Sequence, residues 1–511
     1  MHSVLKMQNI TKSFPGIKAN DNISFELRKS EVHAILGENG AGKSTLMNIL
    51  FGIYKPDFGD ILLNGEVVKI KGPNHANQLG IGMVHQHFKL VKNFTVTENI
   101  ILGIEEVKNG VVDLSASRKR IVDLSEKYNL NVDPDAVISD ITVGMQQRVE
   151  ILKMLYRDAD ILIFDEPTAV LTPQQINDLM LIIEKFTKEG KSVILITHKL
   201  DEIMSVADRC TVLKTGKSIG TVDINKTNKD ELSKMMVGRE VNFKVKKGLP
   251  NIGDIVLKVD NLNLKSATSS KNILKNVNFE VRAGEVVTIA GIDGNGQSEL
   301  IYSITGLIQG ATGNIFVSGT DISNMKVRNR TLTGISHIPE DRHKHGLVLD
   351  YSLEQNLVLQ EYFNTKYQKK GVLDFDEITK NAEELIELFD IRSGRGPRSI
   401  VRSMSGGNQQ KAILAREIAR SPDLLIAVQP TRGLDAGAIE YIHEKIIQER
   451  DKGKSILISS LELDEVMNIS DRILVMFEGE IVADLNPDKT TYEEIGLFMS
   501  GSKRGVSNDQ K

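Results

Sequence analysis

The sequence is poor in several features that mark other classes of protein. It has one cysteine in 511 residues, Cys210, so a disulfide framework is excluded, and a small core residue in a reducing compartment is favoured over a catalytic thiol. No apolar stretch approaches the roughly 18 residues that a membrane-spanning helix needs. Lysine and arginine number 64 against 68 aspartates and glutamates, and the net charge of −4 gives no basic excess for nucleic acid.

The residues that open the chain also lack the pattern of a secretory leader. They run from Met1 through Lys6 directly into a strand-like segment, without an apolar core between them. With neither a leader nor a membrane span, we expect a cytoplasmic protein. Any role at a membrane would then come through a partner, and nucleic acid is not expected as one.

The most informative segment that is present covers residues 37–45. It reads Gly-Glu-Asn-Gly-Ala-Gly-Lys-Ser-Thr, the P-loop pattern G-x-x-x-x-G-K-[ST], and it stands between an apolar strand-like run and a helix-like run. The glycines let backbone N–H groups close around phosphate oxygens, and the N-terminus of the following helix adds positive potential. In this pattern Lys43 reaches the β- and γ-phosphates, and the Ser44 hydroxyl is placed to ligate Mg²⁺.

A second apolar strand-like run, residues 161–164, ends in two carboxylates, Asp165 and Glu166. A carboxylate at the end of a strand binds Mg²⁺ directly or through water. The carboxylate that follows is placed to polarise an attacking water as general base. An Asp-Glu-Pro turn alone is common at strand ends, but the P-loop upstream favours the catalytic interpretation.

The two halves of the chain are similar in sequence. Residues 286–299 repeat the strand–loop–helix pattern around Gly291 but carry Gln297 at the position of the lysine. Three further pairs of segments match in the same order: 23–27 with 277–281, 161–168 with 424–431, and 206–209 with 469–472. Collinear matches across both halves indicate the tandem duplication of one large domain, with a period too long for a solenoid array.

Each half alternates β-branched, strand-like segments with helical ones. This alternation predicts an α/β fold with a mostly parallel, helix-covered sheet in each half. Basic residues, glycine and proline interrupt the pattern between the halves, as is typical of a linker. The expected division is a first domain 1–244, a linker 245–253, a second domain 254–500 and a polar, aperiodic tail 501–511.

With these motifs in place, each half resembles the nucleotide-binding domain of the ATP-binding-cassette (ABC) family. The whole chain resembles the fused tandem ATPase subunits of sugar- and nucleoside-type ABC importers. The resemblance implies two tandem P-loop NTPase domains, each with a helical signature subdomain, and it implies ATP and Mg²⁺ as ligands. It further implies that Gln86 senses Mg²⁺ and the membrane partner, that His198 contacts the γ-phosphate and that Phe14 stacks on adenine.

The family's signature loop, which begins a helix, is matched unequally in the two halves. The second half has Ser405, Gly406 and Gly407, whose hydroxyl and N–H groups suit phosphate. The first half has Val143 where a glycine is expected. The phosphate-binding motifs show the opposite asymmetry, because the second half has replaced most of them. Its replacements are Gln297 for the lysine, Val428 for the metal carboxylate, Gln429 for the base, Ser460 for the histidine and Glu340 at the position of Gln86.

In this family two domains pair head to tail, so that each ATP lies between one domain's P-loop and the other's signature loop. The resemblance therefore implies one complete composite site and one eroded site. Residues expected to contact ATP are Phe14, Gly37, Glu38, Asn39, Gly40, Ala41, Gly42, Lys43, Ser44, Thr45, Ser405, Gly406 and Gly407. Those expected in hydrolysis are Lys43, Gln86, Glu166 and His198, and those expected near Mg²⁺ are Ser44, Gln86 and Asp165.

The resemblance implies an ATPase that energises nucleoside uptake, bound at the cytoplasmic face of the membrane to separate permease subunits, with an extracytoplasmic substrate-binding protein as an indirect partner. Residues 142–153 and 166–173 look closer to nucleoside-importer ATPases than to ribose or galactose ones, so simple sugars are the alternative. A soluble tandem cassette acting on ribosomes or DNA is the competing class. Such proteins usually keep two competent P-loops and a charged linker, and this chain departs from both.

Overall fold

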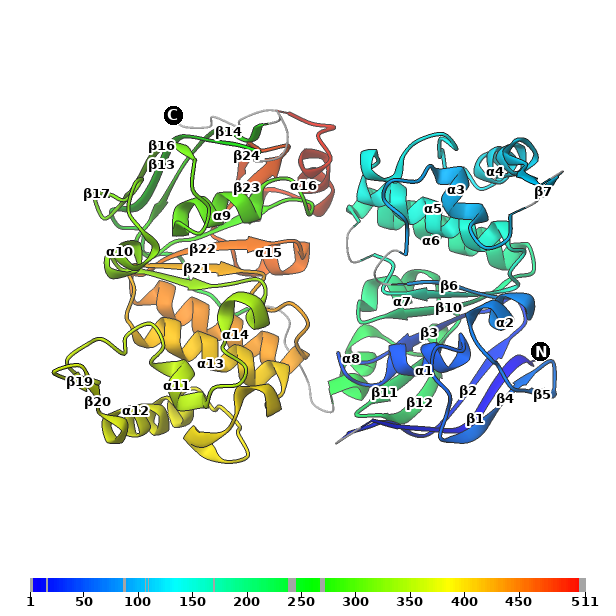
Figure 1. Cartoon of the computed structure of the whole chain (residues 1–511), viewed down its shortest axis with the longest axis horizontal. Coiled ribbons are helices and arrows are strands. Elements are labelled where there is room, and N and C mark those ends of the chain that lie inside the picture. The colour runs from blue at the N-terminus through cyan, green and yellow to red at the C-terminus, as the bar shows by residue number, and fades with distance from the viewer. Residues whose placement is uncertain are drawn as a thin grey trace. The chain divides into compact units, whose positions relative to one another are not determined.

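The chain repeats one arrangement of strands and helices, once in each of two units, Met1–Val241 and Asn242–Lys511. Figure 1 draws the first unit from blue to green and the second from green to red. The computed structural model describes residues 3–14, 17–85, 89–105, 107–108, 110–168, 171–237, 245–266 and 272–504. In this part of the chain, no helix has both the length and the apolar character needed to cross a bilayer.

A six-stranded sheet forms the centre of the first unit, with the strand order β12-β11-β3-β10-β9-β6. All neighbours in it are parallel except β12, which pairs antiparallel with β11. The strands are β3 (Val32–Leu36), β6 (Ile81–Val84), β9 (Ile161–Asp165), β10 (Ser192–Thr197), β11 (Arg209–Lys214) and β12 (Lys217–Asp223). Four of them, β3, β6, β9 and β10, are buried along their whole length, because helices or a second sheet cover both faces. The mostly parallel sheet expected from the sequence is confirmed.

Alternate residues of these strands face two different cores. Leu162 and Leu195 pack with the helices α3 to α6 on one face, whereas Ile163 and Ile196 pack on the other face with α1 and a second sheet. In Figure 1 the cyan helices and the blue strands accordingly lie on opposite sides of this sheet. The helices are α1 (Lys43–Leu50), α2 (Pro73–Gln78), α3 (Val96–Ile101), α4 (Leu114–Lys127), α5 (Val143–Tyr156), α6 (Pro173–Lys188), α7 (Leu200–Val206) and α8 (Lys229–Val237).

The second sheet of the first unit is antiparallel, a layer that the sequence did not predict. Its order is β2-β1-β4-β5, with strands β1 (Ser3–Phe14), β2 (Ile17–Arg28), β4 (Phe58–Leu63) and β5 (Glu66–Val68). A short hairpin of β7 (Val107–Lys108) and β8 (Val111–Val112) precedes α4. Helices α3, α4 and α5 contact one another and form the expected helical subdomain.

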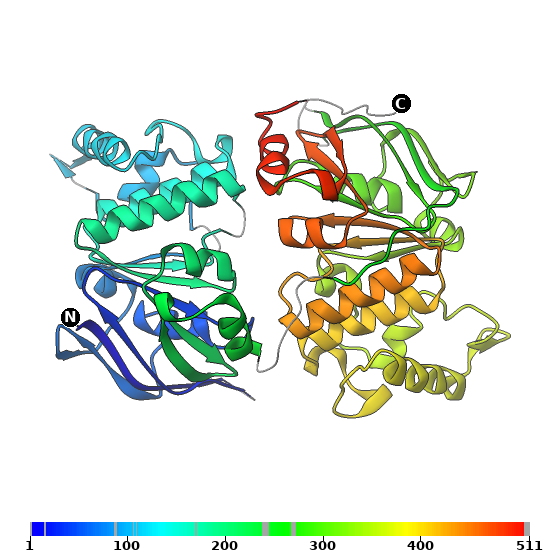
Figure 2. The same ribbon diagram turned by 180° about the vertical axis from the view of Figure 1, so that it is seen from behind.

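The second unit repeats this plan with the sheet orders β18-β21-β22-β15-β23-β24 and β14-β13-β16-β17. Its strands are β13 (Ile255–Lys265), β14 (Asn272–Arg282), β15 (Val286–Ala290), β16 (Thr312–Val317), β17 (Thr320–Asp321), β18 (Ile335–Ile338), β19 (Gln368–Lys369), β20 (Val372–Leu373), β21 (Leu424–Val428), β22 (Ser455–Ser460), β23 (Arg472–Phe477) and β24 (Glu480–Leu485). Its helices are α9 (Gln297–Thr305), α10 (Val327–Leu332), α11 (Leu353–Leu357), α12 (Phe375–Leu388), α13 (Gly406–Ala419), α14 (Ala436–Asp451), α15 (Leu463–Ile469) and α16 (Tyr492–Met499). Figure 2 shows α13 (yellow) and α14 (orange) side by side against one face of the sheet.

The segment 245–253, expected as a linker, runs along the second unit. Val245 packs against a core cluster of that unit, and Lys247 Nζ donates a hydrogen bond to the Ser470 carbonyl. The Gly253 N–H donates to the Ala283 carbonyl at 2.9 Å.

Candidate functional site

The phosphate loop joins the carboxyl end of β3 to the first turn of α1. Gly40 and Gly42 have φ angles of 82° and 98°, in the left-handed region that favours glycine. A Cβ at Gly42 would lie 2.3 Å from the Ala19 carbonyl oxygen, so this position has no room for a side chain. The loop therefore keeps its backbone N–H groups close to the positive end of α1, the geometry of an anion site.

Lys43, the first residue of α1, is 4% exposed. Its Nζ donates hydrogen bonds to the carbonyl oxygens of Gly37 at 2.7 Å and Glu38 at 3.1 Å, and lies 3.9 Å from Glu166 Oε1. Burial lowers the pKa of Lys43, and the charges of Glu166 and Asp165 oppose that shift. The ammonium is thus held inside the loop, where a phosphate chain would meet it.

Asp165 ends the buried strand β9 and faces the phosphate loop. The Ser44 hydroxyl donates to its Oδ1 at 3.3 Å. Burial raises the pKa of Asp165 to about 6, and the neighbouring charge of Glu166 acts in the same direction. A hydroxyl and a carboxylate at this spacing are oxygen ligands of the kind that Mg²⁺ prefers, so these two residues fit the metal expected from the sequence.

Glu166 and His198 follow adjacent strands, and their side chains meet. Oε1 of Glu166 lies 3.3 Å from Nδ1 of His198, and the Glu166 N–H donates to the Ile196 carbonyl at 2.9 Å. Burial alone would raise the pKa of Glu166, but the hydrogen bond and charge of His198, with the charge of Lys43, hold it below its ordinary value. An ionised Glu166 is the form that accepts a proton from water.

The backbone at Glu166 is strained, with a φ of 47° that non-glycine residues seldom adopt. Gln429, at the corresponding place in the second unit, has a φ of 44°. The strain thus belongs to the turn that both units share, while the carboxylate itself is found in the first unit.

The remaining site residues of the first unit have different outcomes. Phe14 ends β1 and is partly exposed, and its ring meets the ring of Tyr54 edge-on at 5.3 Å between centroids. Tyr54 lies just beyond α1, and the sequence analysis missed it because an aromatic after a helix has no distinctive spacing. Gln86 lies outside the described residues.

The two signature loops differ more than their sequences suggest. In the first unit Thr142 caps α5, because its Oγ1 accepts a hydrogen bond from the Met145 N–H. The Gln175 side chain covers the same helix start, so that a Cβ on Gly144 would lie 2.7 Å from Gln175 Nε2. The start of the signature helix of the first unit is therefore capped by Thr142 and approached by Gln175, both from its own unit.

In the second unit, Ser405 starts α13 without capping it, and its Oγ accepts a hydrogen bond from Asn408 Nδ2 at 2.9 Å. A Cβ on Gly407 would make only ordinary contacts, the nearest being Ala438 Cβ at 3.6 Å. Among the described residues, no side-chain cap uses the N–H groups at this helix start, so they are available to an anion.

The phosphate loop of the second unit keeps the backbone form of the first, but Gln297 stands in place of the charged lysine. Gly294 and Gly296 again have left-handed φ angles of 88° and 104°.

Glu340 accepts a hydrogen bond from Gln429 Nε2 at 3.0 Å and forms an ion pair with Arg432. Sequence analysis missed Arg432, because nothing in its spacing marks it as a partner of a residue so far away in the chain.

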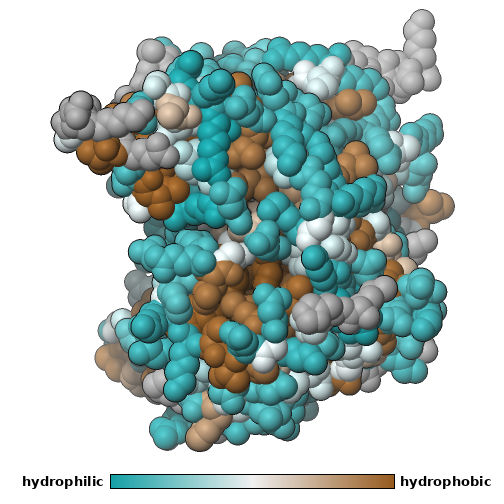
Figure 3. Space-filling model, turned by 90° about the vertical axis from the view of Figure 1, so that its right-hand side faces the viewer, coloured by the Kyte–Doolittle hydropathy of each residue, from teal (hydrophilic) through white to brown (hydrophobic). Residues whose placement is uncertain are grey.

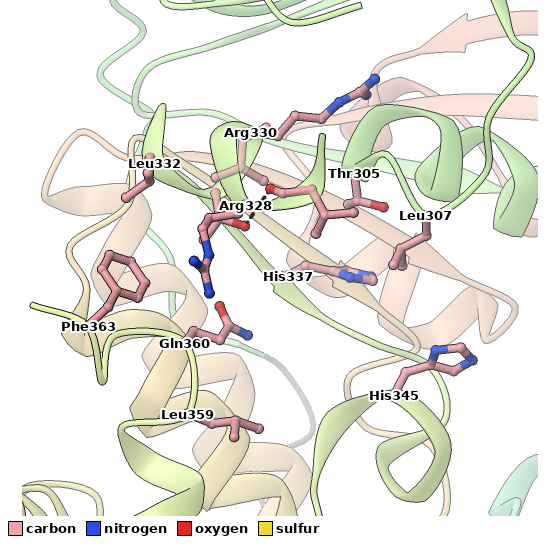
Figure 4. Close-up of a pocket in the computed structure, with 13 residues that line it drawn as sticks. Thr305, Leu307, Arg328, Arg330, Leu332, His337, His345, Leu359, Gln360 and Phe363 are labelled. Carbon is pink, nitrogen blue, oxygen red and sulfur yellow. Dashed lines mark hydrogen bonds between the residues drawn. The ribbon is translucent and has the colours of Figure 1, made fainter. Parts of the chain in front are cut away.

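A cavity of about 420 Å³ opens in the second unit, beside the end of α9. Arg328, Gln360 and Phe363 lie on one side of it, and Leu307 and His345 on the other, with His337 between them (Figure 4). The Arg328 guanidinium lies over the Phe363 ring, 4.9 Å from its centroid. No motif in the sequence predicted this cavity, because its walls come from α9, α10, β18, His345 and residues 359–363.

The comparisons with known proteins agree with this geometry. Residues 20–169 and 274–432 each match the family model described as ABC transporter. The chain belongs to the ABC transporter family. Its two ABC units are those of an ATP-binding, ATP-hydrolysing enzyme, as the resemblance implied.

Relatives that are similar in sequence cover nearly the whole chain. It is 55% identical to the guanosine import ATP-binding protein NupO of Bacillus subtilis (strain 168), over 98% of each chain. It is 54% identical to the nucleoside import ATP-binding protein NupA of Lactococcus lactis subsp. cremoris (strain MG1363), again over 98% of each chain. The glucose import ATP-binding protein TsgD13 of Haloferax volcanii is 44% identical, over 97% of this chain and 96% of its own.

Proposed function

We propose that this ABC ATPase energises the uptake of nucleosides through separate permease subunits. The observation that carries the proposal is the likeness, over 98% of the chain, to two proteins named for guanosine and nucleoside import. The 44% identity to a glucose import ATP-binding protein keeps simple sugars, such as ribose or galactose, as the alternative.

Uptake by cells that produce the chain with its membrane partners separates these substrates. Nucleoside transport predicts accumulation of labelled guanosine that is lost in Lys43→Ala, with ribose accumulation unchanged. Accumulation of ribose that depends on Lys43, without accumulation of guanosine, would overturn the nucleoside assignment and favour the sugar alternative.

The side chains of the first unit are suited to successive parts of ATP hydrolysis. Phe14 stacks on adenine, the phosphate loop binds the phosphate chain, and Lys43 stabilises charge on the transferred group. Ser44, Asp165 and Gln86 would hold Mg²⁺, which would supply further positive charge at the phosphate oxygens. Glu166 takes the proton of the attacking water, and His198 contacts the γ-phosphate while orienting Glu166.

The same proposal pairs the phosphate loop of the first unit with the signature loop of the second. The uncapped start of α13 at Ser405 supports this pairing, because its N–H groups suit a γ-phosphate. The cover of Gln175 over Gly144 argues against a similar role for the first unit's signature loop. One complete site, which includes Ser405, Gly406 and Gly407, then stands against one eroded site. The domain limits 1–244, 245–253, 254–500 and 501–511 belong to the same proposal.

We infer that the permease docks at the cytoplasmic face of the membrane, on the second unit beside the cavity near His337. The cavity near His337 is rimmed by the exposed apolar side chains Leu307 and Leu332. On the face seen in Figure 3, apolar residues also gather in one area bordered by polar ones, and such patches are typical of interaction sites. A substrate-binding protein outside the membrane is an indirect partner, and nucleic acid is not a partner.

Cross-linking tests this docking surface. Because Cys210 is buried, a cysteine introduced by Leu332→Cys would be the accessible thiol among the described residues. Docking predicts a cross-link from position 332 to an integral membrane protein, and none from Leu388→Cys, which is exposed at 65% on α12. Equal cross-linking from both positions, or association with ribosomes instead, would contradict the proposal.

A further inference from the structure

A buried carboxylate joins the two loops that carry Glu166 and His198. Glu202 lies in the first turn of α7 and is 4% exposed. One of its oxygens, Oε1, accepts a hydrogen bond from the Thr168 hydroxyl, and the other, Oε2, accepts one from the Thr197 hydroxyl at 2.8 Å. No motif in the sequence analysis included Glu202.

The two threonines lie in the loops that carry Glu166 and His198. Thr168 follows Glu166 by two residues along the loop after β9, and Thr197 directly precedes His198 at the end of β10. A buried carboxylate needs hydrogen-bond donors to offset its lost hydration, so the bridge is favoured in one geometry. That geometry fixes the distance between the two loops.

We propose that Glu202 is a positioning residue for hydrolysis, which keeps Glu166 and His198 at a fixed position relative to each other. The proposal rests on the roles given above to these two residues. Glu202 acts through them, because each of its two oxygens accepts a hydrogen bond from one of the threonines. The phosphate loop is a separate element, so ATP binding does not depend on the bridge.

The second unit has a buried carboxylate at the place that corresponds to Glu202, with partly different partners. Glu465 of α15 accepts a hydrogen bond from the Thr431 hydroxyl at 2.8 Å and from His443 Nε2 at 2.9 Å. Thr431 follows Gln429, which stands where the first unit has its base. Because β22 ends at Ser460 as β10 ends at Thr197, the place of His198 is taken by Leu461 and not, as the sequence analysis expected, by Ser460. Glu465→Ala is therefore a matched control, which removes an equally buried carboxylate from a unit without a base.

Glu202→Ala is expected to reduce kcat by about tenfold to a hundredfold, because a misplacement of about 1 Å costs about that much. KM and the Kd of ATP should stay within about threefold of the wild-type values, since the phosphate loop is untouched. Glu202→Gln should recover most of the rate. Its amide oxygen accepts from one threonine hydroxyl, and its amide nitrogen donates to the oxygen of the other.

The experiment measures ATP hydrolysis by the full chain, purified with its membrane partners, and ATP binding by titration calorimetry on the full chain alone. The variants are Glu202→Ala, Glu202→Gln, Glu465→Ala and Glu166→Gln. Thr197→Val and Thr168→Val remove one hydroxyl each and test the bridge if Glu202→Ala does not fold. Combining Glu202→Ala with His198→Ala tests the route of the effect, because losses that act through His198 do not multiply.

A lower kcat for Glu202→Ala, rescue by glutamine and a kcat for Glu465→Ala within about threefold of wild type are the expected results. A wild-type kcat for Glu202→Ala, an equal loss in Glu465→Ala, or a raised KM at unchanged kcat would overturn the proposal. Wild-type turnover by Glu166→Gln would instead remove the base from the proposed function. That result is read from a different variant, so the two failures are distinguishable.

Discussion

Oε1 of Glu166 lies 3.3 Å from Nδ1 of His198, although 32 residues separate them in the chain. The contact arises because β9 and β10 are parallel neighbours, so that the residues after both strands meet at one edge of the sheet. The same edge carries Asp165 and the phosphate loop. These groups surround one place at which a γ-phosphate and an attacking water can be held together.

Glu166→Gln is expected to bind ATP with wild-type affinity and to hydrolyse it at least about a hundredfold more slowly, because the water loses its base. The variant should accumulate in a closed, ATP-bound state, which retention of labelled ATP after gel filtration would detect. Turnover near the wild-type rate would show that Glu166 is not the base.

Lys43→Ala should abolish measurable ATP hydrolysis, since the transferred phosphoryl group loses its fixed cation. The loop glycines are unchanged in this variant, so the fold of the first unit should persist. Phosphate release gives the rate, and circular dichroism provides the control for folding. A folded Lys43→Ala protein with more than about a tenth of the wild-type rate would contradict the assignment.

The full chain, purified without partners, should be a weak ATPase, because Gln86 is expected to respond to the permease. Adding the permease subunits in lipid vesicles should raise kcat severalfold. Robust hydrolysis by the chain alone, without association with membrane proteins, would favour a soluble tandem cassette.

His337 should contribute to the pH dependence of the free energy of unfolding. Burial lowers the pKa of His337 to about 4, opposed by the charge of Glu417 and reinforced by His345 and Arg416. Its Nε2 atom is shielded from solvent and has no hydrogen-bond partner among the described residues. The unfolded chain protonates this ring below about pH 6.5 and the folded chain does not, so the contribution to stability is present above that pH and is lost as the pH falls toward 4.

Between pH 7.5 and pH 5 the wild type should therefore lose about 2 kcal/mol more stability than His337→Gln. Thermal unfolding of both proteins across this range measures the difference. If stability depends on pH in the same way in the two proteins, the His337 ring is protonated equally in the folded and unfolded chains, which contradicts this prediction.

Local motifs predicted much of this molecule. The phosphate loop, the carboxylates after β9 and the parallel sheet follow from short patterns of glycine, charge and apolar residues. The tandem duplication could also be predicted, because several segments of the first half match segments of the second half in the same order.

The features that escaped prediction depend on contacts between distant segments. The antiparallel sheet of β1 and β4 pairs strands whose alternation is interrupted by bulges. Gln175 over Gly144, Arg432 beside Glu340, and Glu202 between two threonines are each recognisable only once the chain has folded. Single polar residues of these types are common on any helix or loop, so the sequence offers no signal that selects them.

The pairing between units makes the sharpest contrast among variants. Ser405→Ala and Gly407→Val should impair hydrolysis nearly as much as Lys43→Ala, because the proposed pairing brings the signature loop close to the γ-phosphate. A Cβ at Gly407 would make only ordinary contacts within its own unit, and circular dichroism is the control for the folding of this variant. Thr142→Ala and Gln429→Ala should have mild effects, since the proposal places both in the eroded site.

The most direct test compares kcat for Ser405→Ala and Thr142→Ala in the assembled complex, with Glu166→Gln and Gln429→Ala measured alongside. These variants form two matched pairs, one signature-loop residue and one base-position residue from each unit. A single composite site predicts a large loss for Ser405→Ala and Glu166→Gln and a small loss for the other two. A silent Ser405→Ala together with a Gln429→Ala as damaging as Glu166→Gln would contradict it.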